Sequence, residues 1–148
     1  MTNDICEIMA KRDSVKHATD TGTRVHDALR HVVIDGAHVY GDAQIANEIA
    51  ERPEVAAFFC PESRCEVPVA ATISNKFISR RIDRMIIDDA TKTVKILDYK
   101  TDVERTVRRD KYVNQLHEYA AILRRIYPEY NIVGYILWTH GWVLEKII

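Results

Sequence analysis

The sequence has few cysteines and no long apolar run. Its three cysteines, Cys6, Cys60 and Cys65, are an odd number and form no C-x-x-C pair. Disulfides, a four-ligand zinc site and an iron–sulfur cluster are therefore not expected, and we interpret the cysteines as small buried residues. No uncharged apolar stretch approaches the roughly 18 residues of a membrane-spanning helix, and residues 2–4 are too polar for a secretory signal. We expect a cytoplasmic protein without a membrane partner.

Several catalytic motifs are also missing. There is no G-x-x-x-x-G-K-[ST] loop, no G-x-S-x-G elbow and no histidine pair of the metalloprotease kind. These absences exclude an ATP-driven motor within the chain and argue against acyl transfer through serine. With 148 residues, of which 47% are hydrophobic and 29% charged, the composition predicts one globular domain over residues 1–148.

The net charge of −1 conceals an uneven distribution. Residues 1–70 hold 7 Lys or Arg against 12 Asp or Glu, whereas residues 75–111 hold 11 against 7. A basic middle segment is compatible with a polyanion lying over one face of the protein. Such charges also commonly serve only to keep a surface solvated, so this alternative stays open.

The first half of the chain has helical periodicity. Apolar residues recur at three- and four-residue steps from Val25 to Val33, and again after Asp42, whose side chain suits a helix N-cap. This pattern predicts two helices, with Gly36 and Gly41 bracketing the loop between them.

The period changes from Arg64 onward. Three alternating segments rich in β-branched residues follow one another: 65–69, 78–87 and 94–99. The turn residues Ser74-Asn75 and 88–91 separate them, which predicts an antiparallel meander of three strands.

A helix and two more strands complete the predicted plan. The helix runs from about Glu104 to Ile126 before Pro128, and the strands cover residues 132–138 and 142–147. A meander, a crossover helix and further strands predict an α/β fold in which helices pack on a mixed central sheet.

Two aspartates and a lysine are the most informative residues. Aspartate is depleted in strands, yet Asp83 lies within one apolar strand and Asp98 ends another. Adjacent strands of a meander would bring the two carboxylates together, and alternation places Asp98 and Lys100 on the same face. A Mg²⁺ ion would relieve the repulsion between the carboxylates, and the lysine could stabilise charge on a phosphate. Alternatively, Asp83 pairs with a nearby arginine (Arg80, Arg81 or Arg84), and Asp98 and Lys100 only end a strand.

Four motifs in order resemble those of the RecB-type group of PD-(D/E)xK nucleases. They are 22–26 (G-x-x-x-H), 82–84 (I-D-R), 98–101 (D-Y-K-T) and 115–119 (Q-x-x-x-Y). This group includes the nuclease domains of the RecB and AddA helicase-nucleases and the CRISPR-associated RecB-like exonucleases. The resemblance runs from about Gly22 to Trp138 and implies a restriction-endonuclease-like core.

The resemblance also implies a role for each matching residue. Its metal ligands are Asp83, Asp98, His26 and the backbone carbonyl of Tyr99, and its catalytic lysine is Lys100. Gln115 and Tyr119 line the same cleft, and Glu66 is an auxiliary acid. Arg80 departs from the family, which often has glycine ahead of I-D-R. The residues that we expect to hold the phosphate backbone are Arg81, Arg84, Arg105, Arg108, Arg109 and Lys111.

The sequence therefore predicts a DNA nuclease that depends on Mg²⁺ or Mn²⁺ and has no iron–sulfur cluster. We expect it to act as an exonuclease on single- or double-stranded DNA ends in recombination or repair, with a helicase domain or subunit as a further partner. Two alternatives remain: a catalytically weak or inactive DNA-binding or scaffolding module with the same fold, and a metal-dependent hydrolase of another phosphate ester.

Overall fold

A five-stranded mixed sheet forms the centre of the protein. The computed structural model describes residues 22–148, so Cys6 and the rest of the first 21 residues of the predicted domain lie outside it. The strand order is β3-β4-β5-β6-β7, and a separate two-stranded sheet pairs β1 (Val33–Asp35) with β2 (His38–Tyr40). The α/β class and the mixed central sheet are therefore confirmed.

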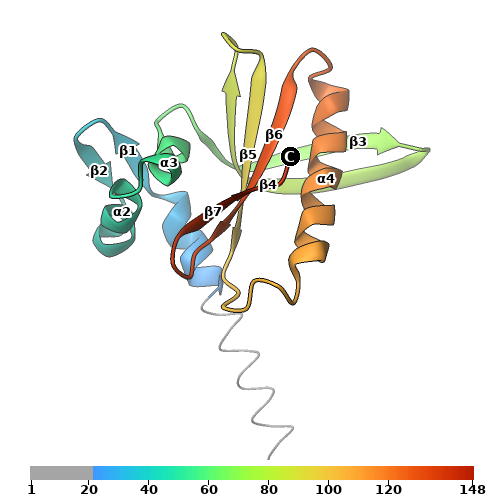
Figure 1. Cartoon of the computed structure of the whole chain (residues 1–148). Coiled ribbons are helices and arrows are strands. Elements are labelled where there is room, and N and C mark those ends of the chain that lie inside the picture. The colour runs from blue at the N-terminus through green and yellow to red at the C-terminus, as the bar shows by residue number, and fades with distance from the viewer. Residues whose placement is uncertain (1–21) are drawn as a thin grey trace, which may run out of the picture.

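The predicted meander is present in full. Strands β3 (Arg64–Ile73), β4 (Lys76–Asp88) and β5 (Thr93–Lys100) pair antiparallel in chain order. Ser74 and Asn75 both have positive φ, 51° and 63°, as the tight turn between two hairpin strands requires. The free end of the β3–β4 hairpin extends beyond α4 in Figure 1.

A crossover helix returns the chain to the sheet. Helix α4 (Arg109–Ile126) connects β5 to β6 (Asn131–Trp138), which pairs parallel to β5, and β7 (Val143–Lys146) then pairs antiparallel to β6. The expected crossover and the two final strands are confirmed. Among the described residues, no helix has both the length and the apolarity needed to cross a membrane.

Two apolar cores lie on the two faces of the sheet. Ile96 of β5 belongs to the core that α4 covers. Leu97 and Tyr99 belong to the core shared with the helix over residues 22–30, α2 (Ala43–Ala50) and α3 (Pro53–Ala56). Figure 1 shows α4 on one side of the sheet and α2, α3 and the β1–β2 hairpin on the other. Because side chains alternate along a strand, Asp98 and Lys100 lie on the α4 side.

Three details of the sequence prediction were wrong. The segment between the two early helices is the β1–β2 hairpin rather than a loop, so Val33 belongs to a strand. A short helix α3 (Pro53–Ala56) and a 3₁₀ turn η1 (Ala57–Phe59) follow α2 and were not expected. Helix α4 begins at Arg109 instead of near Glu104, because residues 101–108 form a loop.

The two described cysteines also differ from expectation. Cys60 and Cys65 are free thiols, as predicted, but each is only partly buried. The Sγ atom of Cys65 lies 3.6 Å from the backbone oxygen of Arg30. They are therefore boundary residues rather than core residues.

Candidate functional site

The site is built where the pairing between β4 and β5 ends. The last pair of that ladder is Arg84 with Leu97, so Asp83 and Asp98 are the next residue on each strand. Asp83 Oδ2 accepts the backbone N–H of Tyr99 at 2.8 Å in place of a ladder hydrogen bond. The two carboxylates lie side by side and are largely shielded, with side-chain exposures of 14% for Asp83 and 5% for Asp98.

This proximity alters the protonation of Asp83. Burial raises the pKa of Asp83, the negative charge of Asp98 and a hydrogen bond between the two carboxyl groups raise it further, and together they bring it to about 8. The N–H of Tyr99 and the charge of Lys100 act in the opposite direction. At neutral pH the pair therefore favours a shared proton or an additional cation.

Lys100 is the cation nearest to the carboxylate pair. Its Nζ atom lies 2.7 Å from Asp98 Oδ2, donates to Gln115 Oε1 at 3.0 Å and sits 4.2 Å from the centre of the Tyr112 ring. The ion pair lacks hydrogen-bond geometry, so Asp98 Oδ2 remains a buried oxygen with no hydrogen-bond partner in the described chain. Asp98 Oδ2 therefore already contacts one cation, the Lys100 ammonium group, and a divalent cation would share the carboxylate with it.

Helix α4 holds the lysine from the other side. Gln115 Nε2 donates to Tyr119 Oη at 2.7 Å, so the lysine, the glutamine and the tyrosine form one chain of contacts. Tyr112 lies one turn before Gln115 on the same helix face. Sequence reasoning missed Tyr112, although the spacing of residues 112, 115 and 119 along a helix could have indicated it.

His26 reaches the site from the helix over residues 22–30. Its Nδ1 atom is 3.8 Å from Asp83 Oδ1, and the edge of its ring faces the Tyr99 ring with the centroids 5.4 Å apart. The structure thus brings together the six predicted catalytic residues, which come from distant parts of the sequence: His26, Asp83, Asp98, Lys100, Gln115 and Tyr119.

Arg84 corrects one prediction. It was expected to hold a phosphate backbone, but it is 1% exposed and its guanidinium lies 4.1 Å from the centre of the Phe59 ring. It donates to Tyr99 Oη at 2.8 Å, to Ser63 Oγ and to the carbonyls of Leu29 and Val32. Arg84 therefore ties the C-terminal end of the helix that carries His26 to strand β5.

The remaining predicted residues lie around the site. Glu66 has φ of 53° within β3 and interrupts the ladder opposite Asp83, since its neighbours Cys65 and Val67 pair with Arg84 and Ile82. Its carboxylate is 3.3 Å from the exposed side chain of Arg81, so nothing in the described chain shows it in the carboxylate pair.

The other expected phosphate contacts are clustered where α4 begins. Arg109 is held by Glu145 at 2.7 Å, and Arg108 lies 4.0 Å from Asp102. Arg105 and Lys111 are exposed. Arg108 and Lys111 line the site and form its basic rim, whereas Arg105 and Arg109 act on Glu145 of β7.

The donor set fits a hard divalent cation that retains water ligands. In residues 22–148, no three side chains of the His, Cys, Asp or Glu type are gathered closely enough to hold a metal by themselves. Mg²⁺, however, is commonly bound through one or two carboxylates together with water and substrate phosphates. The N–H and the carbonyl of Tyr99 point to the same edge of strand β5, and that N–H donates to Asp83. Asp83, Asp98 and this carbonyl together suit Mg²⁺ or Mn²⁺.

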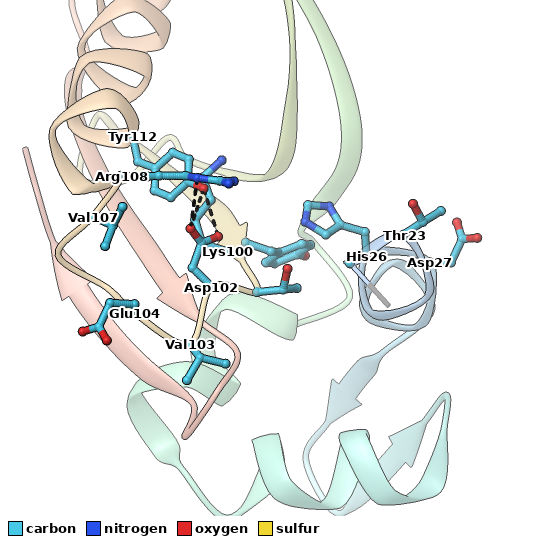
Figure 2. A pocket seen from close by; sticks show the side chains of 13 residues that line it. Thr23, His26, Asp27, Lys100, Asp102, Val103, Glu104, Val107, Arg108 and Tyr112 are labelled. Atoms are coloured by element: carbon cyan, nitrogen blue, oxygen red, sulfur yellow. Dashed lines mark hydrogen bonds and ion pairs between the residues drawn. The ribbon is translucent and has the colours of Figure 1, made fainter. Parts of the chain in front are cut away.

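A cavity of about 940 Å³ opens between the helix over residues 22–30 and the loop over residues 101–108. Figure 2 shows His26 on one wall and Asp102 on the other, with Lys100 between them. The loop is pinned by Asp102, both of whose oxygens lie 2.9 Å from Tyr112 Oη. The cavity provides space for a substrate group directly beside Lys100 and His26.

Comparisons with known proteins add no family assignment. Neither a scan against protein-family models nor a search of curated proteins finds a match to this chain.

Proposed function

We propose that the protein is a divalent-metal-dependent DNA nuclease of the RecB type, with Mg²⁺ or Mn²⁺ as its cofactor. In this proposal the sheet with α4 across one face is a restriction-endonuclease-like core. The observation that carries the proposal is the juxtaposition of Asp83, Asp98 and Lys100 where the β4–β5 ladder opens. DNA ends are its substrate, and a helicase domain or subunit is a further proposed partner.

Each residue of the site has a chemical task in this reaction. Asp83, Asp98 and the Tyr99 carbonyl would hold the cation, which when bound supplies positive charge and lowers the pKa of a water. Lys100, fixed by Gln115 and Tyr112, places an ammonium where charge develops on the phosphate. His26, which lies beside Asp83, would position a water molecule at the exposed side of the two carboxylates. The same proximity that raises the pKa of Asp83 disfavours two free carboxylates and so favours the cation.

The basic rim supports a polyanionic substrate. Arg108 and Lys111 line the cavities of the site, and Arg105 is exposed on the same loop as Arg108. Contacts of this kind neutralise phosphates irrespective of sequence. The rim therefore favours a nucleic-acid strand over a small phosphate ester.

A substrate panel tests the proposal. The purified chain is incubated with linear single-stranded DNA, linear double-stranded DNA, RNA and a chromogenic phosphate monoester, with Mg²⁺, with Mn²⁺ and with a chelator. We expect metal-dependent degradation of DNA and none with the chelator. DNA binding without degradation under any metal would indicate the inactive binding module, and hydrolysis of the monoester alone would indicate another phosphate-ester hydrolase.

A further inference from the structure

A second cavity adjoins the first at Lys100. It measures about 420 Å³ and lies between strand β4 and the first half of α4. Lys100 and Tyr112 line both cavities, so the ammonium group stands at their junction. A strand whose scissile phosphate lies at Lys100 could therefore continue into either space.

The two cavities differ in charge. The first is lined by three acids, Asp27, Asp102 and Glu104, against two cations, Lys100 and Arg108, and its rim carries Val103 and Val107, which are 71% and 75% exposed. The lining of the second contains three cations and one acid, and its members are Arg80, Lys100, Lys111, Asn114, Gln115 and Glu118, besides the shared Tyr112. An anion is therefore favoured in the second cavity over the first.

The cations of the second cavity come from three elements, β4, β5 and α4. Lys111, Asn114 and Glu118 are spaced three and four residues apart, so they form one row along α4. Arg80 of β4 forms an ion pair with Glu118 from the opposite wall, and both side chains are partly exposed, at 45% and 33%. An exposed ion pair of this kind is weak, so an entering anion can take Glu118's place at Arg80.

From this arrangement we propose that the second cavity binds the phosphate next to the scissile one on the same nucleic-acid strand. Arg80 and Lys111 contact that phosphate, and Asn114 lines the same cavity. Glu118 competes for Arg80 and thereby limits affinity for strands that do not fill the cavity. The inference rests on the proposed nuclease function and deepens it, because it assigns a subsite and gives Arg80, the residue that departs from the RecB-type pattern, a purpose.

Binding without catalysis tests the subsite. The probe is a fluorescent single-stranded oligonucleotide, and its anisotropy is measured with the full chain in chelator across a range of salt concentrations. Each lost phosphate contact lowers the slope of log K against log salt by about 0.7 for a single strand. We expect Lys111→Ala to lower the slope by that amount, whereas Arg125→Ala, at the far end of the same helix, leaves it unchanged.

A charge-matched pair separates competition from general electrostatics. Glu118→Gln removes the competitor of the phosphate, so we expect binding to tighten about threefold, in the range of an exposed ion pair. Glu129→Gln makes the same change in net charge on an exposed loop and serves as the control. Equal effects of the two substitutions, or weaker binding by a folded Glu118→Gln variant, would overturn the proposal.

The source of the phosphate is tested in the same assay. If the cavity holds a strand phosphate, millimolar inorganic phosphate displaces the oligonucleotide no better than chloride at equal ionic strength. Stronger displacement by phosphate would mean a free-phosphate site and overturn the strand assignment. A wild-type chain that neither binds nor cleaves DNA refutes the nuclease proposal itself. If the wild type cleaves DNA but the Lys111→Ala and Glu118→Gln variants bind it as the wild type does, only the subsite is refuted.

Discussion

Asp83 accepts the backbone N–H of Tyr99 at 2.8 Å, and this single hydrogen bond fixes its carboxylate against Asp98 where two strands separate. The strand that carries Asp98 and Lys100 is thus coupled to the neighbouring strand through a side chain. Because the hydrogen bond holds the Asp83 carboxylate beside that of Asp98, it raises the electrostatic repulsion between the two acids.

The first prediction concerns the stability of the metal-free protein. The folded-state pKa of Asp83 is raised from 3.8 to about 8, so between these values the native state binds a proton that the unfolded chain does not. Stability contributed by this proton is present at low pH and is lost as the pH rises toward about 8. We expect Asp83→Asn to raise the Tm at pH 8 by roughly 3 °C or more, the shift for about 1 kcal/mol.

Thermal unfolding from pH 5 to pH 8 in chelator checks this prediction. The difference in Tm between the variant and the wild type should grow with pH. Asp35→Asn, an exposed aspartate in β1, is the matched control and should follow the wild type. A constant difference across the range would contradict the coupling.

The second prediction concerns metal binding. A cation between Asp83 and Asp98 replaces the shared proton, so Mg²⁺ or Mn²⁺ should raise the Tm more at pH 8 than at pH 6. A free concentration of 100 times Kd stabilises the folded state by about 2.7 kcal/mol. Asp98→Asn should abolish the effect. Titration calorimetry with the metal measures the loss directly, and an unchanged affinity in a folded Asp98→Asn variant would disprove the site.

The third prediction separates positioning from folding. Gln115→Leu removes the 3.0 Å contact that directs Lys100, so kcat should fall roughly 100-fold, as small misplacements of a catalytic group do. His117→Leu, on an exposed position of the same helix, should leave kcat unchanged. Steady-state kinetics on an oligonucleotide measure both. Equal kcat values for the two variants would show that Gln115 does not position Lys100.

The fourth prediction uses the ring under the lysine. Tyr112→Phe keeps the aromatic face below Lys100 and loses the contact with Asp102, whereas Tyr112→Leu loses both. A cation–π contact is worth about 0.5 to 2 kcal/mol, so the leucine variant should be slower than the phenylalanine variant by a factor of roughly 2 to 30. Identical rates would show that the ring does not position the ammonium group.

The fifth prediction concerns the buried arginine. Arg84→Met leaves the carbonyls of Leu29 and Val32 without their donor, so unfolding free energy should fall by roughly 3 kcal/mol. Because Arg84 is inaccessible, the milder Arg84→Lys should keep the salt dependence of DNA binding, which the exposed Arg81→Ala reduces. A lower salt slope for a folded Arg84→Lys variant would restore Arg84 to the DNA contacts.

Local patterns in the sequence were sufficient to predict most of the sheet. Alternation between Arg64 and Tyr99, with turn residues between the segments, gave three strands in the correct order and pairing. The β1–β2 hairpin was not predicted because strands of three residues are too short to establish an alternating pattern. The late start of α4 was not predicted because the contact between Asp102 and Tyr112 holds residues 101–108 in a loop. No local sequence pattern indicates this tertiary contact.

The candidate site was predictable only in part for a similar reason. Asp83, Asp98 and Lys100 could be brought together from strand order and alternation alone. The burial of Arg84 could not be predicted, because an arginine next to a strand aspartate in sequence is equally compatible with a solvent-facing cation. It becomes a buried donor through tertiary contacts, with the helix over residues 22–30 and with Phe59 and Ser63.

A matched pair of lysines tests the proposed nuclease site. Lys100 and Lys95 lie on the same strand, but only Lys100 stands beside Asp98. Single-turnover cleavage of a linear oligonucleotide is measured in Mg²⁺ for Lys100→Met and Lys95→Met variants with wild-type Tm. We expect loss of cleavage in Lys100→Met and wild-type cleavage in Lys95→Met. Cleavage at the wild-type rate by a folded Lys100→Met variant would contradict the proposal.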